Sequence, residues 1–313
     1  MTTATDTSGS VQPTLHLVPQ ETAQRVNWTA IITYVVISFG ILALMEVPVY
    51  LTGGIAPGGE PNPLFFPLTA VGMFSPAIAA LITTFAVQRP AHPARFLGLA
   101  PVRPWRRTIA YSLIGFFGSW VIGLLGIVIA FAFGVVRLQV PADAAQMLAV
   151  VPLTSLVTAA LTFGEELGWR GFLLPALRPL GTWPALIGHG VLWGLWHTPA
   201  ILLGYNYNTT NPIAVLLMIV TTTTIGCFYG WLRMRSGSVY PSTFAHGALN
   251  GSTGIFLTVL VSGGAVSIVA SPLGWAGWAG ICAIVLVLAV ARTFRWAPQA
   301  APRLKATPRA PSR

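Results

Sequence analysis

Ionisable side chains inside long apolar stretches are the chemically informative feature of this sequence. Placing such a group in a membrane-spanning segment costs at least a few kcal/mol, so each one calls for a function or a partner. Three of the seven acidic residues of the chain lie in or against apolar runs, together with three histidines and an arginine. These residues are Glu46, Glu165, Glu166, Arg170, His189, His197 and His246.

Two adjacent carboxylates and an arginine form the first motif, Thr162-Phe-Gly-Glu-Glu-Leu-Gly-Trp-Arg-Gly171. On a helix, Glu166 and Arg170 are four residues apart on one face, in the order that favours an ion pair. Glu165 points about 100° away from Glu166, and no basic residue lies at helical spacing from it. We therefore expect one neutralised carboxylate and one free carboxylate, which suits a general base that activates water. The alternative is a charged helix end at the membrane surface.

Two histidines and an amide form the second and third motifs. In Trp193-Gly-Leu-Trp-His197, the imidazole lies in an apolar stretch, where it requires a hydrogen-bond partner or a metal. In His246-Gly-Ala-Leu-Asn250, the four-residue spacing places imidazole and amide on one helix face, where two donors stabilise an oxyanion. Polar contacts between helices are the alternative for both motifs. Together the three motifs supply the groups that peptide hydrolysis by water requires.

In their order along the chain, the three motifs resemble the EExxxR, FxxxH and HxxxN motifs of the CAAX protease and bacteriocin-processing family. This family, also called CPBP or Abi, consists of intramembrane proteases, and the chain is similar to its type II CAAX prenyl endopeptidases. The resemblance covers about residues 148–260. Trp193 stands where the family motif has Phe, and we expect this exchange to affect the shape of the pocket but not its chemistry.

The resemblance implies a glutamate-type intramembrane endopeptidase. Its substrate is expected to be a membrane-tethered or lipidated, CAAX-like polypeptide. In the family, the first Glu of the first motif activates water together with the His of the second motif, and the third motif forms the oxyanion hole. Carried over, the catalytic residues are Glu165, His197, His246 and Asn250, the structural ion pair is Glu166 with Arg170, and Trp193 lines the pocket.

The family is commonly labelled metalloprotease, so metal binding is a separate question. Two His and one Glu can form a catalytic zinc site, and here the ligands would be Glu165, His197 and His246. The HExxH motif, which places two histidine ligands and the base on one helix, is absent from the sequence. We therefore prefer a water-activating glutamate without a cofactor, and zinc is the alternative.

The composition predicts that the chain spans a membrane. Of its 313 residues, 54% are hydrophobic and only 8% are charged, about a third of the usual charge content of soluble proteins. Apolar segments near the roughly 20 residues that cross a hydrocarbon core occur at 28–50, 66–87, 109–134, 147–166, 183–203, 212–232, 239–261 and 274–291. The motifs fall on the fourth, fifth and seventh segments. We therefore expect an all-α polytopic membrane protein with eight spans and its catalytic cavity among these three.

The net charge of +10, from 17 basic and 7 acidic residues, reflects membrane orientation and not nucleic-acid binding, because the basic residues cluster between apolar segments. If the N-terminus is cytoplasmic, 16 basic residues fall in cytoplasmic segments and Arg137 alone lies in an outer loop. The positive-inside rule then predicts a cell-membrane protein with both termini in the cytoplasm. We also expect the cavity to open toward the cytoplasm.

We divide the chain into three regions. Residues 1–27 form a disordered cytosolic tail, residues 28–296 form the transmembrane protease domain, and residues 297–313 form a basic disordered tail. Glu46, which precedes Pro48, is expected to have an interfacial or kink-associated role. His189 matches no motif and is expected to be a hydrogen-bonded interfacial histidine.

Two other functions remain open at this stage. In a proton- or cation-coupled transporter, Glu165, His197 and His246 would bind the transported ion. In a non-catalytic bacteriocin-immunity protein, the same motifs would serve helix packing only. The expected partners are the lipid bilayer and a membrane-tethered protein substrate.

Overall fold

Apolar helices account for most of the computed structural model, which describes residues 25–55, 62–100, 104–262 and 267–297. Six helical segments of this described part are long and apolar enough to cross a membrane. They are Trp28–Leu51, Phe65–Gln88, Trp105–Ala132, Ala144–Leu180, Ile213–Ser236 and Ile268–Val290. The chain is therefore an all-α polytopic membrane protein. The two predicted tails lie almost entirely outside the described residues.

Short breaks divide the long apolar segments into smaller elements, of which η1 and η2 are π-helices and η3 is a 3₁₀-helix. A two-residue antiparallel ladder pairs Arg137 with Ser262. The elements are α1 (Trp28–Leu51), α2 (Phe65–Gly72), α3 (Ser75–Thr83), η1 (Thr84–Gln88), α4 (Pro93–Phe96), α5 (Trp105–Ala132), β1 (Arg137–Leu138), α6 (Ala144–Ala149), α7 (Val151–Glu166), η2 (Leu167–Leu173), α8 (Leu174–Leu177), η3 (Arg178–Leu180), α9 (Thr182–Trp196), α10 (Thr198–Leu202), α11 (Ile213–Ser236), α12 (Tyr240–Leu260), β2 (Val261–Ser262), α13 (Ser267–Ala270) and α14 (Trp275–Val290).

Two of the predicted spans, 183–203 and 239–261, are not among the six apolar segments. The first is divided into α9, with 15 residues, and the short α10. The second corresponds to α12, whose 21 residues are long enough but include many Ser, Thr and Gly residues besides His246 and Asn250. α12 packs against α5 and α7, and α9 packs against α11. Because protein and not lipid surrounds much of their surface, these helices can carry the polar residues.

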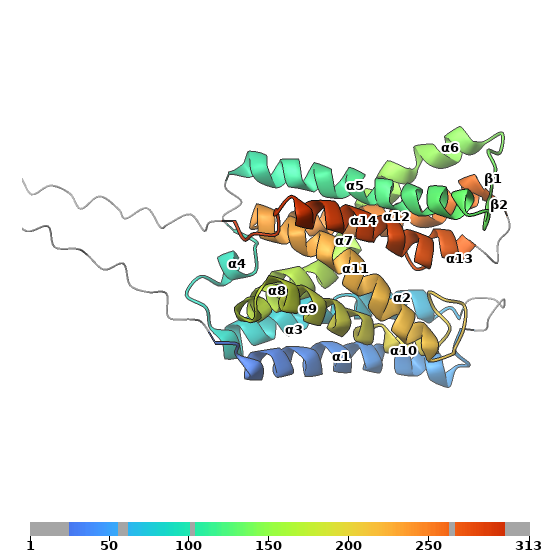
Figure 1. Ribbon diagram of the computed structural model, residues 1–313. Helices are drawn as coiled ribbons and strands as arrows, with labels where there is room; N and C mark the ends of the chain where they lie inside the picture. Colours follow the sequence, from blue (N-terminus) through green and yellow to red (C-terminus); the bar gives the residue numbers. More distant parts are fainter. Residues whose placement is uncertain (1–24, 56–61, 101–103, 263–266, 298–313) are drawn as a thin grey trace, which may run out of the picture.

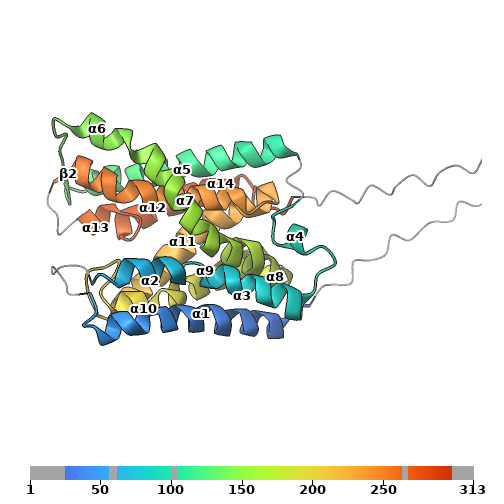
Figure 2. The ribbon, with the colours of Figure 1, turned by 180° about the vertical axis from the view of Figure 1, so that it is seen from behind.

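The helices form two layers with diagonal elements between them. In Figure 1, α1, α3 and α9 lie in one layer and α5, α12 and α14 lie in the other, while α11 crosses diagonally. The view from behind shows α7, followed by η2 and α8, crossing the molecule on the other side (Figure 2). The start of α1 and the end of α14 lie at the same end of the bundle, at the left of Figure 1.

Glycines bring α12 into close contact with α7. A Cβ atom added at Gly247 would collide with the backbone of Ala159, and one added at Gly251 would lie 2.7 Å from the Cα atom of Ser155. Two small residues four positions apart share one helix face, the pattern that lets membrane helices approach closely. The contact places His246, next to Gly247, near the C-terminal end of α7, where Glu166 lies.

We expect Gly247→Ala to lower the melting temperature of the purified protein, because the added methyl group meets the backbone of Ala159. Gly254, on the same helix, has no atom within 4 Å of an added Cβ and provides the control. Gly254→Ala should leave the melting temperature unchanged or raise it slightly, since Ala has a helix propensity about 1 kcal/mol better than Gly. Thermal unfolding in detergent measures both, and equal melting temperatures would contradict the close α7–α12 contact.

Candidate active site

The first motif lies where α7 ends and a π-helix follows. Glu165 and Glu166 are the last two residues of α7, and Arg170 lies in η2. A Cβ atom at Gly168 would collide with Pro76 of α3, so this glycine lets η2 pack directly onto α3. π-Helical turns are frequent at functional sites, where they change the direction of side chains relative to the preceding helix.

Glu166 accepts two hydrogen bonds on a single oxygen. Arg170 Nη1 lies 2.6 Å from Glu166 Oε1, and both side chains are fully buried. His246 Nδ1 lies 2.9 Å from the same oxygen, and because a carboxylate oxygen accepts here, Nδ1 carries the proton. Glu166 therefore pairs with Arg170 within one helical turn and also connects α7 to α12.

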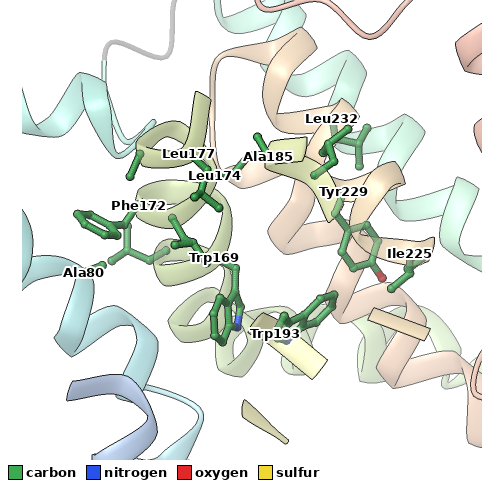
Figure 3. Close-up of a cluster of buried hydrophobic side chains, with 14 of the residues drawn as sticks. Ala80, Trp169, Phe172, Leu174, Leu177, Ala185, Trp193, Ile225, Tyr229 and Leu232 are labelled. Carbon is green, nitrogen blue, oxygen red and sulfur yellow. The ribbon is translucent and has the colours of Figure 1, made fainter. Parts of the chain in front are cut away.

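Two aromatic rings lie against the guanidinium group of Arg170. Its guanidinium carbon lies 4.1 Å from the ring centroid of Trp193 and 5.0 Å from that of Tyr229. Both rings belong to the buried cluster drawn in Figure 3, in which Trp169 lies beside Trp193. Such cation–π contacts reach about 2 kcal/mol when water is excluded. The two rings therefore stabilise the buried guanidinium in addition to its pairing with Glu166.

Arg233 holds the backbone of the first motif in place. Its Nε donates to the carbonyl of Arg170 at 3.0 Å, and its Nη2 donates to the carbonyl of Phe96 at 2.9 Å. Arg170 and Arg233 were expected to be orientation charges, but both side chains are buried and hold the first motif. The remaining basic residues still fall almost entirely in the segments predicted to be cytoplasmic.

Glu165 has a neutral partner instead of a cation. Its Oε2 accepts a hydrogen bond from Trp193 Nε1 at 3.0 Å, and the side chain is buried next to the cavity described below. Phe, the residue at this place in the family motif, has no such donor. The expectation that Trp in place of Phe affects only the shape of the pocket is therefore wrong, because the exchange adds a hydrogen bond to the carboxylate.

His197 caps the C-terminal end of α9. Its Nδ1 lies 2.8 Å from the carbonyl oxygen of Trp193, and because a carbonyl oxygen only accepts, Nδ1 carries the proton. In the neutral ring, Nε2 then has a lone pair that can accept a proton. Asn250 lies one helical turn after His246 on α12 and is exposed.

One cavity of about 300 Å³ brings these residues together. Glu165, His197, His246 and Asn250 all line it, and so does Trp193. Glu166 and Arg170 are fully buried behind its wall. The arrangement places a carboxylate, an imidazole with a free nitrogen and a pair of potential donors at one space, which is the combination needed to activate water and bind an oxyanion.

The cavity extends away from the end of the bundle at which α1 begins. Tyr205, Asn206 and Leu273 line both this cavity and a second hollow, which Phe65 also lines. Tyr205 and Asn206 follow α10, and Leu273 precedes α14, at the opposite end of the bundle (Figure 1). The two hollows therefore share lining residues at the end of the bundle opposite the start of α1.

Two further ionisable residues lie outside this arrangement. His189 is fully buried, with its ring 6.2 Å from that of Trp169 and 6.3 Å from that of Trp193, so it is not the interfacial histidine that was expected. Glu46 Oε1 accepts a hydrogen bond from Thr69 Oγ1 at 3.0 Å and is buried. Because Thr69 lies in α2, this bond connects α1 to α2. Thr69 also lines the cavity.

The three residues considered as zinc ligands do not form a metal site in the described part of the chain. No group of three His, Cys, Asp or Glu side chains there is arranged to hold a metal ion. Moreover, Glu165 Oε2 already accepts from Trp193, and His246 Nδ1 already donates to Glu166. In the described structure, the three side chains are thus held by hydrogen bonds and are not grouped around one metal position.

Comparison with known proteins finds matches over the motif-bearing part of the chain. Residues 144–252 match the family described as type II CAAX prenyl endopeptidase Rce1-like. A segment of 58 residues is 41% identical to CAAX prenyl protease 2 of Methanococcus maripaludis, which covers 18% of this chain and 21% of that protein. The match thus spans about a fifth of the length of the curated relative.

We expect Glu166→Gln to lower the melting temperature strongly, because the substitution leaves the buried Arg170 without its counter-charge. Breaking a buried ion pair from one side typically costs about 3–5 kcal/mol. Asp143→Asn is the matched control, since Asp143 is exposed and its side chain makes no capping hydrogen bond. Thermal unfolding of both variants checks the prediction, and a Glu166→Gln protein as stable as Asp143→Asn would contradict the buried pair.

Proposed function

We propose that the chain is an intramembrane endopeptidase, because residues 144–252 match the Rce1-like family of type II CAAX prenyl endopeptidases. Its substrate is a membrane-tethered or lipidated, CAAX-like polypeptide. The observation that carries the proposal is that Glu165, free of any cationic partner in the described structure, shares a cavity with His197, His246 and Asn250. This set fits a glutamate-type peptidase.

The proposed reaction begins with a water molecule between Glu165 and His197. Glu165 accepts a proton from the water as the water oxygen forms a bond to the scissile carbonyl carbon. His197, through Nε2, orients the same water. When the tetrahedral intermediate collapses, the bond to nitrogen breaks and the proton held by Glu165 passes to the leaving amine. The products are a carboxylic acid, which then loses its proton to water, and an amine, and the side chain of Glu165 returns to its starting state.

The oxyanion of the intermediate is bound by His246 and Asn250. His246 already donates from Nδ1 to Glu166, so it donates from Nε2 to the oxyanion only as an imidazolium. The carboxylate of Glu166 holds the ring in place through Nδ1. Asn250 supplies the second donor through its amide nitrogen. Removing one such donor typically costs about 10²–10³-fold in kcat.

No metal ion is needed for these steps, and we propose that none takes part. The support is that no group of three His, Cys, Asp or Glu side chains among the described residues is arranged to hold a metal ion. Stoichiometric, tightly bound zinc that is lost on substitution of His197 or His246 would contradict this proposal.

For the topology we propose eight membrane spans with both termini in the cytoplasm of the cell membrane. The six apolar segments and the more polar segments α9–α10 and α12 together make eight. The concentration of basic residues at the end where α1 begins supports the orientation. The catalytic cavity then lies among the fourth, fifth and seventh spans.

The function is tested by mass spectrometry of terminal peptides on membranes from cells that express the wild type, Glu165→Gln or the control Glu46→Gln at equal levels. Loss of a general base reduces the rate by about 10²–10⁴-fold. We therefore expect new protein termini with the wild type and with Glu46→Gln, but not with Glu165→Gln. Identical termini with a folded Glu165→Gln protein would overturn the proposal and favour the transporter or immunity function.

We expect Trp193→Phe, which restores the family residue, to lower kcat while KM stays nearly constant. The variant keeps the aromatic ring but removes the hydrogen bond to Glu165. Hydrogen bonds to charged groups contribute about 1.5–3 kcal/mol, so kcat should fall by about 10- to 100-fold. Steady-state kinetics on a cleaved peptide, with the melting temperature measured alongside, checks this. A variant with unchanged kcat would show that the indole N–H has no part in positioning Glu165.

A further inference from the structure

The ion pair between Arg170 and Glu166 uses only one atom of each group. Arg170 Nη1 lies 2.6 Å from Glu166 Oε1, whereas Arg170 Nε and Nη2 and Glu166 Oε2 are buried without a hydrogen-bond partner among the described residues. Arginine–carboxylate pairs are frequently bidentate, with two parallel N–H···O bonds. Because both groups have atoms left for a second bond, another contact must hold the guanidinium in this one-point arrangement.

His189, on α9, is a second buried polar side chain of this region. Its ring is fully buried, and neither Nδ1 nor Nε2 has a hydrogen-bond partner in the part of the chain that the structure describes. The ring centroid lies 6.3 Å from that of Trp193, whose face is covered by the guanidinium of Arg170 at 4.1 Å. Figure 3 shows Trp193 between Trp169 and Tyr229. Buried polar atoms nearly always bond to protein or to ordered water, so His189 and Arg170 both require a further partner.

Gly226, on α11, lies next to both of these side chains. A Cβ atom built on Gly226 would lie 3.5 Å from Nδ1 and Cε1 of His189 and 3.7 Å from Nη2 of Arg170. These are ordinary van der Waals distances, so the position accepts a group of about the size of a methyl group, which is also about the size of a water molecule. Elsewhere α9 and α11 pack tightly, since a Cβ at Gly190 would lie 2.5 Å from the Cα atom of Thr223.

We propose that a buried water molecule binds beside Gly226, where it accepts a hydrogen bond from Arg170 Nη2 and donates one to His189 Nδ1, and that His189 is thereby a positioning residue of the site. The neutral imidazole then carries its proton on Nε2. A neutral ligand fits here, because Glu166 already neutralises Arg170. Buried waters typically make about two to four hydrogen bonds, and these two side chains supply the first two.

The water fixes the rotation of the guanidinium group of Arg170. With Nη2 held by the water, only Nη1 faces Glu166, and the flat face of the group stays against Trp193. Without the water, a second N–H would turn toward Glu166 Oε2 and the guanidinium would leave that face. Because Trp193 donates to Glu165, the turn would shift the proposed base. Because Glu166 accepts from His246, it would also shift the proposed oxyanion donor.

An experimental structure of the full chain, at a resolution that shows ordered water, tests the water site itself and does not depend on the proposed function. In the wild type we expect density within hydrogen-bond distance of both Arg170 Nη2 and His189 Nδ1. In Gly226→Ala we expect this density to be lost, because the added methyl group takes the position. A wild-type map that shows other ordered water but none here, or a direct bond between the two side chains, overturns the inference.

Steady-state kinetics on a cleaved peptide test the positioning role of His189, which rests on the proposed function. We expect Gly226→Ala and His189→Phe to lower kcat by about 10- to 100-fold, the loss that a misplacement of about 1 Å can cause, while KM stays nearly constant. His189→Gln keeps a hydrogen-bond acceptor and should retain most of the activity. Gly123→Ala is the matched control for Gly226→Ala, because its added Cβ also lies 3.5 Å from an aromatic ring, that of Phe256, with no polar atom near it.

Melting temperatures measured in parallel separate positioning from a purely structural role. We expect Gly226→Ala and His189→Phe to lose activity while their melting temperatures stay close to that of Gly123→Ala. Wild-type kcat in both variants, or a loss of activity that only follows the loss of folded protein, overturns the positioning role. If the wild type cleaves no peptide, the proposed function fails, and the density beside Gly226 still decides whether the water is bound.

Discussion

The double hydrogen bond to one oxygen of Glu166 is the interaction on which the rest of the site depends. A carboxylate buried in a membrane protein is stable only when it is paired, and here Arg170 and His246 both donate to Oε1. This arrangement neutralises Glu166, fixes the π-helix relative to α12, and orients the ring of His246. Glu165, the neighbouring residue, points elsewhere and receives only the indole N–H of Trp193. Helical geometry directs the two adjacent carboxylates apart, and the packing of α12 and α9 gives them different partners.

The sequence predicted the features that depend on local spacing. Apolar runs indicated the membrane helices, and the four-residue spacing of Glu166 and Arg170 predicted their ion pair, because neighbours on a helix follow from its period. The contact of His246 with Glu166 joins residues that are 80 positions apart, and no periodicity reports such a contact. The indole hydrogen bond of Trp193 was missed for a related reason, since it depends on the packing of α9 beside α7. The sequence did show Trp193 in place of the family Phe, and the N–H donor of the indole could have indicated a hydrogen bond to a nearby carboxylate.

Burial also changes the meaning of charges that sequence alone treats as equivalent. Arg170 and Arg233 read as orientation signals in the sequence, whereas the structure buries both and uses them to hold the first motif. The segments that contain α9 and α12 read as membrane spans, but neither is among the six apolar segments, because α9 has only 15 residues and α12 contains many Ser, Thr and Gly residues. The buried cluster around Arg170 is likewise assembled from segments that are distant in sequence.

A double-mutant cycle on kcat tests most directly whether Glu165 and His197 act on one water molecule. Glu165→Gln, His197→Gln and the double variant are compared with the wild type on a peptide cleaved by the wild-type enzyme. Residues that act as a unit show strongly non-additive losses. The account predicts that the double variant loses no more activity than the more impaired single variant. A loss equal to the product of the two single losses would contradict it, because the two side chains would then contribute independently.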